Sequence, residues 1–162
     1  MEEKKIITNV FKNNKKSPSK TNVINHNSEI IAINSLYLMD CFNHLEPSLK
    51  KIINLIKTKI NSYMQQDIKK ERLDNENKVS VPYVLEKLVE SRLCCCYCKT
   101  SVIIDYQETR QMDQWTLDRI NNYIGHNEGN VLISCLKCNL ERRRIKKDHF
   151  LFTKRLVLTK MN

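Results

Sequence analysis

The chain has 162 residues, of which 41% are hydrophobic and 28% charged, and this suits a globular protein of one ordinary domain with an appendage. It holds only two glycines, which disfavours an all-β fold rich in tight turns and favours helices. The formal net charge of +10 favours nucleic acid or another polyanion as a partner, although a merely basic protein would carry the same charge.

No apolar stretch is long enough for a transmembrane helix, and the N-terminus lacks the apolar core and cleavage site of a secretory signal. We therefore expect no membrane partner and no secretion. A reducing intracellular compartment, such as the cytoplasm, the nucleus or a viral factory, is expected instead. In such a compartment the seven cysteines indicate metal ligation rather than disulfides. Cys41 stands apart from the other six and is interpreted as a buried apolar residue.

Residues 1–27 carry six lysines against two glutamates and few large apolar side chains, which predicts a flexible basic arm. This arm is either a tether to nucleic acid or a simple disordered tail. A helical region is expected over residues 28–78. Ser28 can cap a first helix that reaches about residue 45, and a long amphipathic helix follows Pro47 and extends to about Leu73. Its apolar stripe packs on the first helix or, in the alternative, residues 28–73 meet a protein partner.

A module is expected over residues 79–162. Ser80 and the early Pro82 open a short helix that leads directly into a cysteine-rich run. The segment from Trp115 to Ile120 alternates like a strand, residues 130–135 form a second β-rich run, and a helix begins at Leu136. A short C-terminal helix completes the chain. The predicted fold class is α+β and mostly helical, with N-terminal helices ahead of a metal-stapled strand–strand–helix module.

Two CxxC pairs bound this module. Each pair presents two thiolates to one ion, and zinc takes four such ligands in a tetrahedron. Matched pairs are a strong signal, and we expect one structural zinc per chain. Because three cysteines run consecutively at Cys94, Cys95 and Cys96, Cys94 could replace Cys95 in an irregular turn. The expected ligands are Cys95, Cys98, Cys135 and Cys138.

The order CxxC, Leu-Asp-Arg-Ile, Gly-Asn-Val and CxxC-Asn, followed by basic residues, resembles the HNH or ββα-metal endonucleases. It is most similar to their zinc-containing branch, typified by recombination endonuclease VII, and to viral and phage relatives. The resemblance covers about residues 79–148. It implies a catalytic Mg²⁺ or Mn²⁺ held by Asp118 and Asn139, with Asn130 tying the intervening loop together. Oxygen ligands suit such a hard cation, which also binds the scissile phosphate.

Arg119 departs from the family pattern, because it occupies the position of the general-base histidine. An arginine does not deprotonate at neutral pH and cannot act as a base, but it can pair with a phosphate. Three alternatives follow. His126 acts as the base, or Glu128 or a metal-bound water does, or the site has lost hydrolysis and only binds.

A dense basic stripe follows Asn139. Its position beside an expected phosphate site favours phosphate contacts over a merely solvated helix face. With Arg119, the nucleic-acid contacts predicted here are Arg142, Arg143, Arg144, Lys146 and Lys147.

The leading functional hypothesis is a metal-dependent endonuclease that hydrolyses phosphodiester bonds, with DNA as the favoured partner. One alternative is a catalytically inactive zinc module that binds nucleic acid within a replication, transcription or other nucleoprotein complex. Another is a protein-interaction subunit built on the long helix.

Overall fold

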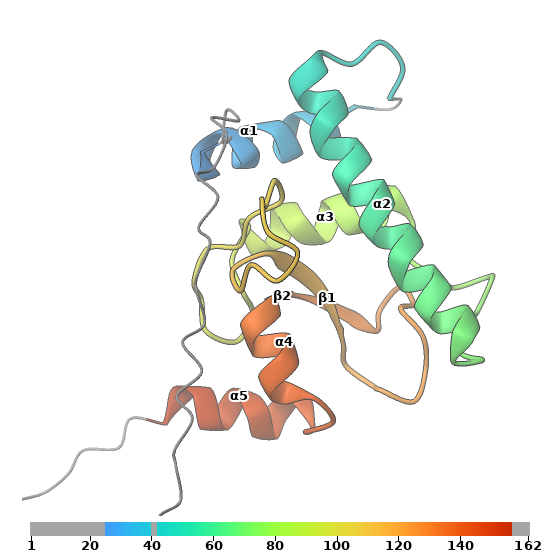
Figure 1. Cartoon of the computed structure of the whole chain (residues 1–162), viewed down its shortest axis with the longest axis vertical. Helices are drawn as coiled ribbons and strands as arrows, with labels where there is room; N and C mark the ends of the chain where they lie inside the picture. Colours follow the sequence, from blue (N-terminus) through green and yellow to red (C-terminus); the bar gives the residue numbers. More distant parts are fainter. Residues whose placement is uncertain (1–24, 40–41, 157–162) are drawn as a thin grey trace, which may run out of the picture.

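The computed structural model describes residues 25–39 and 42–156 (Figure 1). Cys41 lies outside these residues, and so does the arm expected over residues 1–27, except for its last three residues. About half of this part of the chain is helical, and the α+β class is confirmed. Within it, no helix is both long and apolar enough to cross a membrane. The elements are α1 (His26–Tyr37), α2 (Pro47–Lys69), α3 (Val81–Ser91), β1 (Trp115–Arg119), β2 (Val131–Cys135), α4 (Leu136–Arg142) and α5 (Lys147–Arg155).

The first helix begins earlier and ends earlier than the sequence predicts. Its N-cap is Asn25, whose side-chain Oδ1 accepts the backbone N–H groups of Asn27 and Ser28 at 2.8 and 3.2 Å. Ser28 therefore lies inside α1, which ends at Tyr37 instead of near residue 45. The second helix begins with Pro47 in its first turn, as predicted, and ends four residues before Leu73.

The sheet consists of β1 and β2, paired antiparallel with Trp115 opposite Cys135 and Arg119 opposite Val131. Both strands were predicted within one residue. The second strand leads into α4 without a loop, because Cys135 ends β2 and is also the N-cap of α4. This connection lays α4 across both strands, with α5 below it in Figure 1.

Side chains of α2 satisfy the other edge of β1. The Leu117 N–H donates to the Tyr63 hydroxyl at 3.1 Å, and the Lys59 ammonium donates to the Trp115 carbonyl and, at 2.9 Å, to Gln114 Oε1. Burial lowers the pKa of Lys59 to about 7. The two-stranded sheet thus presents no bare edge on this side. The apolar stripe of α2 packs inside the chain, which is the simpler of the two predicted arrangements.

The helical region and the module share one hydrophobic core, formed by buried side chains from Ala32 in α1 to Phe150 in α5. A buried polar contact joins them as well. The Glu29 carboxylate of α1 accepts the backbone N–H groups of Ile104 and Asp105, the latter at 2.7 Å. Burial raises the pKa of Glu29, and the hydrogen bonds from these two amides act in the opposite direction. The two expected regions therefore form one packed body.

Candidate functional site

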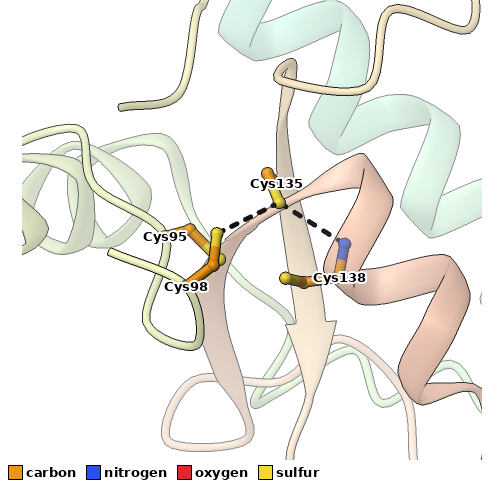
Figure 2. Close-up of side chains that lie close together, drawn as sticks. All are labelled: Cys95, Cys98, Cys135 and Cys138. Atoms are coloured by element: carbon orange, nitrogen blue, oxygen red, sulfur yellow. Dashed lines mark hydrogen bonds between the residues drawn. The ribbon is translucent and has the colours of Figure 1, made fainter. Parts of the chain in front are cut away.

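The four predicted zinc ligands lie together, and Figure 2 shows them converging from the turn after α3, the end of β2 and the first turn of α4. The sulfur atoms of Cys95, Cys98, Cys135 and Cys138 all lie within 4.8 Å of one another. The Cys98 and Cys135 sulfurs are 3.8 Å apart. Four sulfurs placed about 2.3 Å from a tetrahedral zinc would be separated by about 3.8 Å. The cluster can therefore hold one metal ion such as zinc.

The consecutive cysteines are now distinguished, since Cys95 belongs to the cluster and neither Cys94 nor Cys96 does. The turn is closed by the Lys99 N–H, which donates to the Cys95 carbonyl at 3.0 Å. The Cys96 N–H donates to the carbonyl of Ile133 in β2, also at 3.0 Å. These bonds fix the first CxxC pair against the strand that carries the second pair. A hydrogen bond from the Cys135 thiol lowers the pKa of Cys95, so one thiolate is already favoured.

Asp118 is held in a buried ion pair with Arg142. The guanidinium donates from Nε to Oδ2 at 2.6 Å and from Nη2 to Oδ1 at 2.8 Å, and the Tyr97 hydroxyl donates to Oδ2 at 2.6 Å. Asp118 is 3% exposed and Arg142 is 0% exposed. Burial lowers the pKa of Arg142, but Asp118 outweighs it and the net shift is upward. Both carboxylate oxygens thus already have cationic partners, which leaves little reason for a metal cation to bind there.

Asn139 and Asn130 hold neighbouring parts of the module. The Asn139 amide donates to the Thr116 hydroxyl of β1 at 3.1 Å. Asn130 spans the loop between the strands: its Oδ1 accepts the Asn121 N–H at 2.8 Å, and its Nδ2 donates to the carbonyls of Asn121 and Gly125. Three hydrogen bonds from one side chain therefore hold the ends of this loop together.

Arg119 lies between the strand loop and α2. Its Nη1 donates to the Ile124 carbonyl at 3.2 Å and lies 3.8 Å from Asp67 Oδ1. Burial lowers the pKa of Arg119, while Asp67 acts in the opposite direction. Asp67 also accepts the backbone N–H of His126 at 2.7 Å and faces the ring Nδ1 at 2.8 Å. The expected base position is therefore an arginine anchored by a carboxylate of α2.

The two side chains proposed as bases, His126 and Glu128, are engaged elsewhere. His126 is 7% exposed, stacks on Tyr63 with ring centroids 4.4 Å apart, and has its pKa lowered by burial. Glu128 accepts the Ser80 hydroxyl at 2.8 Å and the Ser80 N–H at 3.3 Å, at the start of α3. In this structure both side chains therefore make contacts within the fold, His126 with Asp67 and Glu128 with Ser80.

Gly125 explains how this loop approaches α2 so closely. A Cβ at this position would lie 2.5 Å from the Arg72 carbonyl oxygen and 3.0 Å from the Asp67 carboxylate. Any larger residue would push the loop away from the end of α2. One of the two glycines of the chain is thus needed for the contact that brings Arg119, His126 and Asp67 together.

A basic cleft lies beside this contact, with a volume of about 810 Å³. Among the described residues, six cationic side chains and no acidic one line it. Polar or apolar side chains of the strand loop complete the lining. The cations are Lys70, Arg72, Arg119, Arg143, Arg144 and Lys146, and the remaining residues are Ile120, Asn121, Asn122 and Tyr123.

Four of the predicted nucleic-acid contacts therefore line one cleft, and two do not. Arg142 needs correction, since it has no exposed surface and its charge faces Asp118. Lys147 is half-buried, lies outside the cleft lining and pairs with Asp148 at 3.7 Å.

The cleft also contains Lys70, Arg72 and Tyr123, which the sequence patterns did not indicate. Lys70 is the C-cap of α2 and Arg72 follows two residues later, and basic residues at a helix C-terminus are also expected for the helix dipole. Tyr123 is a lone aromatic side chain in a polar loop, and it is 86% exposed. An aromatic residue among asparagines was a usable signal, but the contribution of α2 depends on tertiary contacts.

Comparison with known proteins gives no assignment, because no family model, curated protein or solved structure matches this chain.

Proposed function

We propose that this protein binds nucleic acid through the basic cleft, in a module stapled by one structural zinc ion. The observation that carries the proposal is that all charged residues lining the cleft in the described part of the chain are cations, which come from the segment just after α2, from the end of β1 and from the segment between α4 and α5. A polyanion gains binding energy there by neutralising its phosphates and releasing counterions. Among the described residues of the lining, no acidic side chain opposes it.

Zinc would act as scaffold in this proposal. The four thiolates join the turn after α3 to the β2–α4 junction, and α4 in turn leads to Arg143 and Arg144. Holding that junction fixes the wall of the cleft that these arginines form. The ion itself would not contact the phosphate.

Fluorescence anisotropy with a labelled DNA duplex tests the proposal. We expect log Kd to change linearly with log salt, because binding to phosphates releases counterions. The double variant R143Q/R144Q should weaken binding and lower the salt slope by about two, roughly one for each phosphate that is no longer neutralised. A matched control, K50Q/R110Q, removes the same charge at two exposed cations outside the cleft. Equal losses for the two double variants, or binding that ignores salt, would refute the cleft as the binding site.

The second candidate is metal-dependent phosphodiester hydrolysis at an HNH-like site, as the sequence resemblance implies. One observation favours it: Asn139 and Arg142 of α4 bond to Thr116 and Asp118, alternate residues of β1. Asp118 of β1 and Asn139 of α4 therefore both lie where this strand and this helix face each other. Hydrolysis would require Arg142 to release at least one Asp118 oxygen to Mg²⁺ or Mn²⁺.

Nicking of a supercoiled plasmid in Mg²⁺ or Mn²⁺ distinguishes the candidates. Under the leading proposal, wild-type protein at saturating concentration nicks no faster than the D118A variant. Nicking by wild type that D118A and N139A both abolish, while both variants keep their DNA affinity, would establish the second candidate.

A further inference from the structure

We infer that the ligand of the cleft is a single-stranded segment of nucleic acid, with one base stacked on the ring of Tyr123. This inference rests on the proposed function, since it specifies the ligand of the same cleft. It is carried by an exposed aromatic ring in the lining of a cationic cleft, on a loop that is fixed on both sides.

The loop that carries Tyr123 is held in place by its neighbours. The Tyr123 N–H donates to Asn121 Oδ1 at 2.9 Å, and the Asn121 N–H donates to Asn130 Oδ1. The preceding carbonyl, that of Asn122, accepts from Arg72 Nη1 at 2.8 Å. Asn121 is thus anchored to Asn130 in the loop between the strands, and Asn122 to Arg72, just after α2. The ring is presented to solvent on a backbone that has little left to order on binding.

An aromatic ring that is 86% exposed on such a backbone gains little packing within the described chain. Its phenol is the only aromatic group among the described residues that line the cleft. A nucleobase offers the flat apolar face that would cover it. Stacking of bases on aromatic side chains beside a cationic groove is the usual way in which proteins hold single strands without strong sequence preference.

The size and position of the cleft favour a single strand over a duplex. Its volume of about 810 Å³ lies in the range of sites for compact ligands, roughly 300–1,000 Å³, and suits a short stretch of a flexible strand. The bases of a duplex are stacked on one another and cannot reach Tyr123 without being unpaired. In a single strand, the phosphates can pair with Arg143 and Arg144 while a neighbouring base turns towards the ring.

The test compares three probes on the full chain: a thymidine dodecamer, its duplex with the complementary strand, and a dodecamer of abasic sites that keeps the phosphates but has no bases. We expect wild type to bind the thymidine strand most tightly. The Y123A variant should lose about tenfold in affinity for that strand and nothing for the abasic one, whereas Y123F should retain wild-type affinity. Circular dichroism confirms that each variant is folded.

A thymidine affinity unchanged in Y123A, or lost equally for the thymidine and abasic probes, would overturn the stacking interaction. So would tighter binding of the duplex than of the single strand by wild type. In each case, a selective loss of affinity in R143Q/R144Q would leave the proposed function standing. If that double variant also bound every probe as wild type does, the cleft would not be the nucleic-acid site, and the proposed function would fail as well. Photocrosslinking with 5-iodouridine in the single strand should label Tyr123, and labelling confined to other residues would contradict the assignment.

Discussion

The guanidinium of Arg142 is bound to both carboxylate oxygens of Asp118, at 2.6 and 2.8 Å, where neither side chain is more than 4% exposed. Nη2 also donates to the Arg119 carbonyl, and Nη1 donates to the Ile145 carbonyl at 2.7 Å. One side chain of α4 thereby holds the end of β1 and the turn before α5. From the sequence, Asp118 was expected to act in catalysis and Arg142 to contact DNA. In this structure the two residues form a buried ion pair that links β1 to α4.

Removing one member of this pair should be costly. We expect D118A to lower the free energy of unfolding by about 3–5 kcal/mol, because Arg142 would keep a buried charge without its counterion. Urea denaturation followed by circular dichroism measures this change. Lys50, which is exposed, provides a control, since K50A should change stability by less than about 0.5 kcal/mol.

The double variant D118L/R142M sharpens the same point. Replacing both charges by apolar side chains removes the uncompensated charge, so the double variant should be more stable than D118A. A double variant less stable than D118A would mean that Arg142 stabilises the fold mainly through its bonds to the carbonyls of Arg119 and Ile145.

The four-cysteine metal site leads to a prediction that separates the cysteines that bind the metal from their neighbours in the sequence that do not. C95S and C138S should lose bound zinc, because Cys95 and Cys138 belong to the four-cysteine cluster. C94S and C96S should keep about one zinc per chain, because Cys94 and Cys96 do not belong to it. Native mass spectrometry of the purified proteins gives the stoichiometry. A structural zinc contributes on the order of 10 kcal/mol of apparent binding free energy in small domains, so a chelator should lower Tm markedly in wild type. Zinc retained in C95S, or lost in C96S, would assign the ligands differently.

The strands and the metal cluster could be predicted because their signals are local. Alternation marks β1, and CxxC spacing marks the thiolates whatever the rest of the chain does. The orientation of Arg142 was also within reach of the sequence. Cys138 must point towards the metal, and a residue four positions later on the same helix shares its face. Arg142 therefore faces inward, while Arg143 and Arg144 face the solvent.

The remaining features depend on contacts between distant parts of the chain. Nothing in the sequence near Asp67 indicates that it accepts from His126 or lies beside Arg119, since each of these partners is more than 50 residues away. Lys70 and Arg72 join the cleft for the same reason, through the close approach of the Gly125 loop to α2. A local pattern can show that a helix is amphipathic, but it does not show which loop packs against its end.

Glu29 tests whether the N-terminal helices and the module fold together. Its carboxylate accepts two backbone N–H groups from the module, so E29A should leave these buried donors unpaired, at about 1–3 kcal/mol for each. We expect unfolding to remain a single transition that shifts to lower urea when followed by both Trp115 fluorescence and far-ultraviolet circular dichroism. The exposed Glu46 makes no side-chain cap bond, so E46A is the matched control. Separate transitions for the two signals would mean that the regions unfold independently.

Lys59, which contacts the edge of β1, should make the free energy of unfolding depend on pH. Burial lowers its pKa in the folded chain to about 7, whereas the unfolded value is near the ordinary 10.5. Between these values the unfolded chain binds more protons, so the free energy of unfolding should rise with pH, by at most about 1.4 kcal/mol per pH unit. K59M lacks this titration. The stability of wild type minus that of K59M should therefore increase from about pH 7 to about pH 10 in urea denaturation. A flat difference for K59M would show that Lys59 keeps its proton while bonded to the Trp115 carbonyl and Gln114.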